Sequence, residues 1–167
     1  KAYVWPHTLL TAIAARALNR PVRIQLTRAQ MYSMVGHQPA TIQTIELAAD
    51  RRGKLTGIRH ESTSPTPVFD DYIEYAAMAS RHLWAASAGI ATNHKVVHVN
   101  RNTPTAMRSP HEALGHFALE SAMDELAYAA GVDPIKLRLL NDSETDPLSG
   151  RPFSTRAIRK CLAEGGA

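Results

Sequence analysis

The chain has 167 residues, with 19 Lys and Arg against 15 Asp and Glu, so its formal net charge is only +4. This length is enough for one domain with a hydrophobic core and short for two. The small charge and the lack of any long basic run argue against a nucleic-acid-binding function. A single cysteine, Cys161, excludes a disulfide framework and a metal site built from several thiolates. No apolar stretch is long enough to predict a membrane span.

The first part of the chain predicts two helices with a strand between them. Residues 8–18 carry apolar side chains around most of a helical circumference, so we expect this helix to be buried on several sides. Apolar and polar residues alternate over 22–26, which predicts a short strand. A second helix is predicted over 27–35, with Thr27 as its N-cap.

The middle of the chain predicts β-structure. Two extended runs, 42–49 and 55–62, flank a turn in which Gly53 is free to adopt a positive φ, and this pattern predicts a β-hairpin. The sequence Ser64-Pro65-Thr66-Pro67 predicts a loop. A further short strand is predicted over 96–99.

The last part predicts three helices. The longest runs from about Pro110 to Ala130 and ends at Gly131. The next begins at Asp133-Pro134 and ends at Asn141, and the last is predicted from a Ser154 cap to Ala163, with Cys161 as a buried side chain. The predicted fold class is α+β: a mixed or antiparallel sheet containing a β-hairpin and covered by helices.

The histidines do not predict a metal centre. His94 and His98 are four residues apart on a predicted strand, without a carboxylate close by in sequence. Three residues separate Glu112 from His116, where the zinc motif HExxH requires two. We therefore predict no metal ligands in this chain, and no nucleophile motif is present.

Two turns are candidates for binding. The turn Met107-Arg108-Ser109-Pro110 leads into the longest helix, where backbone N–H groups and the Arg108 guanidinium would suit an anion. The alternative is a capped helix with an exposed arginine. In a second turn, the His37 imidazole and the Gln38 amide could orient a polar ligand, and the alternative there is a solvated turn.

Several separated segments resemble the molybdenum-binding subunit of the xanthine dehydrogenase and aldehyde oxidase family. Together they extend over almost the whole chain. The matching segments are residues 5–10, 14–16, 19–22, 26–31, 106–112, 115–127, 131–134 and 137–141.

This resemblance implies part of a molybdenum hydroxylase, which oxidises an aldehyde or a heteroaromatic carbon with water as the oxygen source. It implies a molybdopterin cofactor, often a dinucleotide, with iron–sulfur clusters and FAD on other chains or domains that receive the electrons. We expect residues 1–167 to be a single domain excised from the molybdopterin-binding region. On its own this piece is expected neither to hold the cofactor tightly nor to turn over. We expect the cytoplasm as its location, with the periplasm as the alternative.

The resemblance also assigns residues. It places the family's catalytic glutamate in a later segment, so no catalytic residue is expected in this chain. Met107, Arg108 and Ser109 match the family's loop beside molybdenum, and the turn with His37 and Gln38 matches its substrate pocket. Purine-oxidising members have an arginine in that turn and a phenylalanine where this chain has Pro110, so both departures favour an aldehyde. Carbon monoxide dehydrogenases place a cysteine next to the loop arginine, where this chain has Ser109. The alternative to an enzyme part is a non-catalytic structural or assembly module.

Overall fold

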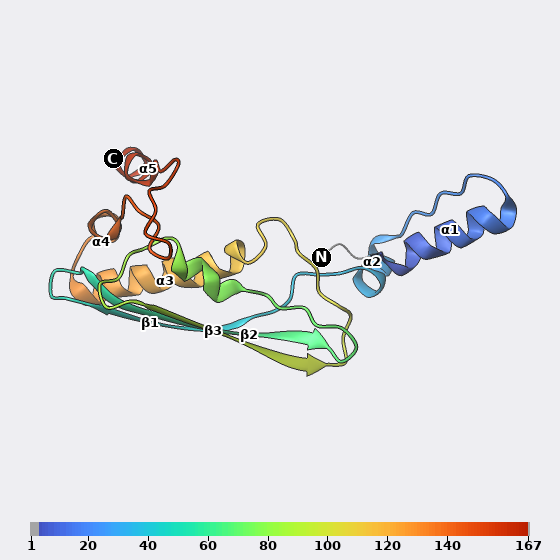
Figure 1. The fold of residues 1–167 in the computed structure, drawn as a ribbon, viewed down its shortest axis with the longest axis horizontal. Helices are drawn as coiled ribbons and strands as arrows, with labels where there is room; N and C mark the ends of the chain where they lie inside the picture. Colours follow the sequence, from blue (N-terminus) through green and yellow to red (C-terminus); the bar gives the residue numbers. More distant parts are fainter. Residues whose placement is uncertain (1–3, 167) are drawn as a thin grey trace.

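The computed structural model describes residues 4–166 and shows a body with an arm at one end (Figure 1). In the body, a three-stranded sheet carries α3 and a short 3-10 helix, η1, on one face, with α4 and α5 near the β1–β2 turn. The arm consists of α1, the segment that returns from it, and α2. The elements are α1 (Pro6–Leu18), α2 (Arg28–Met34), β1 (Ile42–Ala49), β2 (Leu55–Pro67), η1 (Ala76–Arg81), β3 (Ile90–Val99), α3 (Glu112–Ala130), α4 (Pro134–Asn141) and α5 (Ile158–Gly165).

The sheet is mixed, which confirms the predicted fold class. β1 pairs with β2 in the antiparallel direction, and β2 pairs with β3 in parallel, in the order β1-β2-β3. The predicted hairpin is confirmed, and Gly53 has a φ of 86°. The Asp50 carboxylate closes the turn by accepting hydrogen bonds from the backbone N–H groups of Arg52 and Lys54.

The loop predicted at Ser64–Pro67 is wrong, because β2 continues through both prolines as far as Pro67. Pairing with β1 ends at Thr63, whereas pairing with β3 continues to the end of β2. The Ile58 N–H donates to Gly89 on the β3 side, so odd-numbered residues of β2 direct their backbone nitrogens to the opposite side. The nitrogens of Pro65 and Pro67, which carry no hydrogen, therefore face the β1 side. Because β1 is not paired with β2 beyond Thr63, no hydrogen bond between strands is lost there. β3 is also longer than the predicted 96–99.

The core lies between the sheet and α3. Leu119, Met123 and Ala127 form the buried stripe of α3 and pack with Leu55 and Trp84. The predicted helix ends are confirmed at Gly131, which has a φ of 66°, and at Asp133, which accepts from the Lys136 N–H. The capping box of Thr27 and Gln30 confirms the predicted start of α2.

The arm differs from prediction in two respects. Residues 21–27 form no strand, because no described strand lies beside them to complete a ladder. α1 contains no buried residue, although burial on several sides was predicted, and Leu9, Leu10 and Ile13 are each more than half exposed. The arm extends away from the body, so the body does not cover these three side chains (Figure 1).

The C-terminal helix also differs from prediction. It begins at Ile158 and has no side-chain cap, so Ser154 does not cap it. Cys161 is exposed, not buried. Ile158 and Leu162, four residues apart, are the side chains of α5 that pack against the core, and Cys161 lies off that stripe.

Candidate functional site

The predicted binding turn is an exposed loop between two fixed ends. Residues 106–110 are all exposed, whereas Thr103 and Pro104 just before them are buried. The helix starts two residues later than predicted, at Glu112, because Ser109 and His111 have positive φ values of 56° and 68°. Such values are unfavourable for non-glycine residues and persist only where the surroundings impose them.

The loop offers hydrogen-bond donors to a ligand. Within the described residues, the Arg108 side chain is exposed and has no partner, and the backbone N–H groups of Arg108, Ser109 and His111 have none either. Two donors at the helix start are not available to a ligand, because the N–H groups of Glu112 and Ala113 donate to the carbonyls of Pro110 and Ser109. The remaining donors, one cationic, fit an anionic group such as a phosphate.

The second predicted turn lies beside the segment that leads into this loop. The Thr105 N–H donates to the carbonyl of His37 at 3.0 Å. Gly36 packs so closely here that a Cβ would lie 2.5 Å from Thr105 Cγ2 and 2.7 Å from the Trp5 ring. Two segments almost 70 residues apart in sequence are therefore in contact.

His37 and Gln38 nevertheless face different hollows. His37 lines one of about 520 Å³ with Tyr32, Arg101 and Asn102. Gln38 lines another of about 690 Å³ along the start of α3, where its neighbours include Leu114 and Phe117. Pro110 lines neither of these two, so the structure brings the turns together without collecting all the predicted substrate residues around one cavity.

The sequence did not point to a buried carboxyl group below the loop. The Glu74 side chain is 2% exposed, and its Oε1 lies 2.6 Å from Nδ1 of His111. The backbone N–H of Tyr75 donates to the same Nδ1 at 3.0 Å. The Tyr75 ring meets the rings of His111 and His94 edge-on, each at 5.4 Å between centroids. Burial lowers the pKa of His94, and the nearby His111 lowers it further.

A second polar group missed by the sequence lies under the sheet. His60 is fully buried, with Nδ1 2.7 Å from Ser80 Oγ and Nε2 2.9 Å from Gln43 Oε1. Gln43 Nε2 donates to the carbonyl of Leu114, so its Oε1 accepts from His60 and the Ser80 hydroxyl donates to the ring. Burial, and then the proximity of His94, lower the pKa of His60 to about 4. This buried histidine connects β2 to η1 through Ser80, and to β1 and α3 through Gln43.

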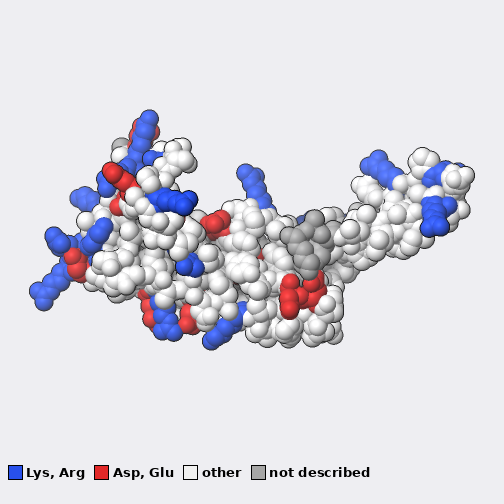
Figure 2. Space-filling view, in the orientation of Figure 1, with Lys and Arg blue, Asp and Glu red and all other residues white. Residues whose placement is uncertain are grey.

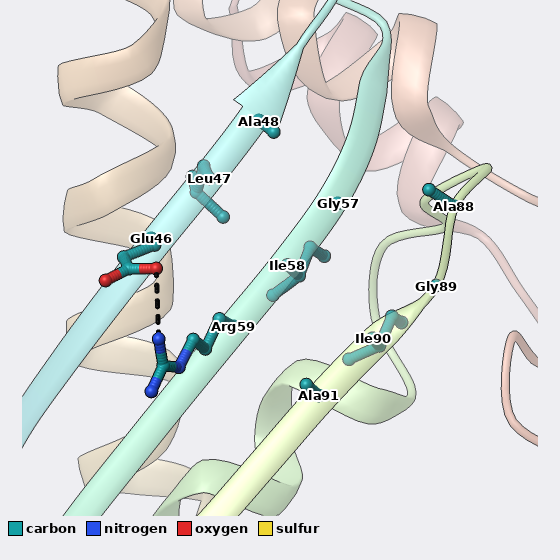
Figure 3. A pocket seen from close by; sticks show the side chains of 10 residues that line it. All are labelled: Glu46, Leu47, Ala48, Gly57, Ile58, Arg59, Ala88, Gly89, Ile90 and Ala91. Atoms are coloured by element: carbon teal, nitrogen blue, oxygen red, sulfur yellow. Dashed lines mark ion pairs between the residues drawn. The ribbon is translucent and has the colours of Figure 1, made fainter.

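The sheet face opposite α3 carries a shallow hollow of about 480 Å³ at the hairpin end (Figure 3). Arg59 crosses it and pairs with Glu61 at 2.7 Å and with Glu46 at 3.7 Å. Its guanidinium is already paired, and the other lining residues are mainly small or aliphatic. This hollow therefore offers little chemistry.

The charge of the arm is of one sign. No acidic residue precedes Glu46 in the sequence. Figure 2 accordingly shows Lys and Arg but no Asp or Glu over the arm, whereas both signs occur on the body.

In the described part of the chain, no three His, Cys, Asp or Glu residues are grouped to hold a metal ion. Residues 4–166 contain no helix that is both long and apolar enough to cross a membrane.

Comparison with known proteins assigns the family. The sequence model of the molybdopterin cofactor-binding domain matches residues 1–142, which is most of the chain. The chain belongs to this family. The match to the molybdopterin cofactor-binding domain confirms the resemblance recognised in the sequence.

One similar protein is PaoC, the aldehyde oxidoreductase molybdenum-binding subunit of Escherichia coli strain K12, which is 39% identical over 166 residues. The match covers 99% of this domain and 22% of PaoC, so the chain spans about a fifth of that relative. Quinoline 2-oxidoreductase from Pseudomonas putida 86 has a TM-score of 0.83 at 20% identity, covering 95% of this domain and 22% of that chain. Aldehyde oxidoreductase from Desulfovibrio gigas has a TM-score of 0.81 at 21% identity, covering 97% and 18%. These two structures establish the fold of the domain.

Proposed function

We propose that this domain is part of a molybdenum hydroxylase that oxidises an aldehyde, with water as the oxygen source. Family membership supports a molybdopterin cofactor, and the likeness to PaoC supports an aldehyde substrate. The observation that carries the proposal is the exposed loop 106–110, whose unpartnered donors lie next to the turn that holds His37 and Gln38.

In this proposal the loop binds the cofactor and the turn orients the substrate. Arg108 and the free backbone N–H groups of Arg108 and Ser109 hold an anionic part of the cofactor, and Met107, 47% exposed, adds an apolar contact. The bound cofactor supplies the centre that transfers oxygen from water and takes up two electrons. His37, Gln38 and Pro110 border the substrate, where the imidazole and the amide orient a neutral carbonyl group.

We propose the dinucleotide form of the cofactor, with iron–sulfur clusters and FAD on other chains or domains. PaoC is named as a molybdenum-binding subunit, so it is one component of a larger enzyme. The 167 residues themselves contain a single cysteine, which is too few to ligate a cluster. The electron acceptors therefore belong elsewhere in the assembly.

The test is Arg108→Ala in the full-length protein, with Arg51→Ala as a matched control. Both arginines are exposed and lack partners in the described part of the chain, so neither change should alter the melting temperature. Loss of charge-assisted hydrogen bonds to the cofactor should lower molybdenum content or aldehyde turnover about tenfold or more. If Arg108→Ala matches Arg51→Ala in both measurements, the loop does not hold the cofactor.

One observation favours the alternative of a non-catalytic assembly module. α1 has no buried residue and several exposed apolar side chains, as in a helix that packs against a partner. Full-length protein that carries the cofactor yet oxidises none of a panel of aldehydes would support this alternative.

A further inference from the structure

The exposed loop cannot maintain its own conformation. Residues 106–110 are all exposed, yet Ser109 and His111 are held at positive φ. Such a backbone conformation is unfavourable for a residue with a side chain, so contacts outside the loop must impose the geometry. The question is which contacts these are.

The upstream end is fixed by burial and by one backbone hydrogen bond. Thr103 and Pro104 are buried, and Thr105 donates to the His37 carbonyl. These contacts place the chain where it enters the loop. They do not reach Ser109 or His111, so the downstream end requires its own anchor.

The downstream anchor is the contact between His111 and Glu74. Nδ1 and Oε1 are 2.6 Å apart, and a buried carboxyl group is costly to leave without a partner. The Tyr72 hydroxyl lies farther away, at 3.4 Å from the other oxygen of Glu74. His111 is therefore the principal partner of Glu74, and pulling its ring away would leave the buried group poorly compensated.

The same part of the body holds α3 again one turn later. A Cβ on Gly115 would lie 2.1 Å from the carbonyl oxygen of Ala76, so the helix backbone is seated directly on η1. Positions 111 and 115 lie on one face of the helix start. Two contacts on that face fix both the position and the rotation of the first turn of α3.

We propose that the Glu74–His111 pair is a positioning clamp that holds the downstream end of loop 106–110 in the form that presents its free donors. The effect on the loop follows from the contacts alone, whereas the consequence for cofactor retention rests on the proposed function. Glu74 and His111 are positioning residues here, because the Glu74 carboxyl group is too deeply buried to touch the cofactor.

The experiment compares Glu74→Ala, Glu74→Gln and the control Asp142→Ala in the full-length protein purified with its cofactor. Asp142 is a similarly buried carboxylate, 5% exposed and paired with Arg156 at 2.6 Å. Removing it tests the loss of a buried anion elsewhere. The two measurements are molybdenum content and loop exchange, which is the hydrogen–deuterium exchange of peptides covering residues 111–115. In these loop peptides the N–H groups of Glu112, Ala113 and Gly115 donate to the carbonyls of Pro110, Ser109 and His111.

Glu74→Ala should speed exchange in the loop peptides several-fold, because the His111 ring loses its shorter contact and keeps only the one with the Tyr75 N–H, and it should lower molybdenum content. Glu74→Gln should restore both, since its amide can either donate to or accept from Nδ1. Asp142→Ala should leave the loop peptides and the molybdenum content unchanged even if it lowers the melting temperature.

Unchanged loop exchange in Glu74→Ala would overturn the clamp, as would equal loop exchange in Glu74→Ala and Glu74→Gln. Faster loop exchange with unchanged molybdenum content would uphold the clamp and refute the loop as a cofactor site. If Glu74→Ala does not fold, the same exchange measurement on His111→Ala and on His111→Gln, which can again bond to Glu74, decides the question.

Discussion

Replacing Gly36 with alanine should separate the two turns that form the candidate site. The new Cβ would lie 2.5 Å from Thr105 Cγ2, 2.6 Å from Thr105 Cβ and 2.7 Å from the Trp5 ring, all closer than real Cβ contacts. Overpacking of this kind costs about 1–3 kcal/mol. Because three overlaps occur at once, we expect Gly36→Ala to destabilise the contact between the turns by about 2 kcal/mol or more, in the upper part of this range. Moving residues 36–38 away from Thr105 would relieve the overlap.

A movement of that size would reduce cofactor retention. If the separated form is favoured by about 2 kcal/mol, the apparent affinity of the site for its ligand falls about 30-fold. The assay is molybdenum content of the full-length variant after dialysis, together with its melting temperature. Gly57→Ala is the control, because its Cβ would make only an ordinary contact of 3.7 Å with Ala48. Equal molybdenum content and melting temperature in the two variants would refute the close packing inferred at Gly36.

The remaining predictions concern buried polar groups. The pKa of His60 is lowered from 6.5 to about 4 by burial, so the unfolded chain binds this proton more readily than the folded one. The associated stability, about 3 kcal/mol, is fully present above pH 6.5 and is lost as the pH falls towards 4. Melting temperature should therefore fall less steeply over this range in His60→Gln, and parallel pH profiles would contradict the assignment. Asn141 is buried, accepts from the Leu55 N–H and donates to the carbonyls of Gly53 and Leu137. Asn141→Asp removes both donations and buries a charge, so urea denaturation should show a loss of about 3–5 kcal/mol, and a loss below about 1 kcal/mol would exclude this network.

Local patterns predicted the helices and the hairpin because their causes are local. Gly53 at the turn, Thr27 before α2 and Gly131 after α3 act within a few residues of their own position. The strand predicted over 22–26 failed because a strand requires a partner, and no described segment pairs with it. Alternation alone reports which side chains would share a face, not whether a neighbouring strand exists.

The loop predicted at Ser64–Pro67 failed for a related reason. Proline excludes a residue from a ladder only if its nitrogen faces a partner strand, and that depends on where β1 ends. Part of the candidate site could not be predicted from the sequence for the same reason, because it also depends on contacts between distant segments. Arg108 and His37 were found from motifs, but Glu74 approaches His111 across 37 residues of chain with no short-range signal.

Pro65 also determines what the edge of β2 beyond its pairing with β1 can accept. A foreign extended segment arriving beside Pro65 would meet its carbonyl group but no amide hydrogen, so it could not continue the pattern that strand addition requires. This margin of the sheet is consequently protected against edge-to-edge growth, the first step of many forms of aggregation. At Pro65 the protection is intrinsic to the covalent structure of the residue, and at Pro67 burial adds to it.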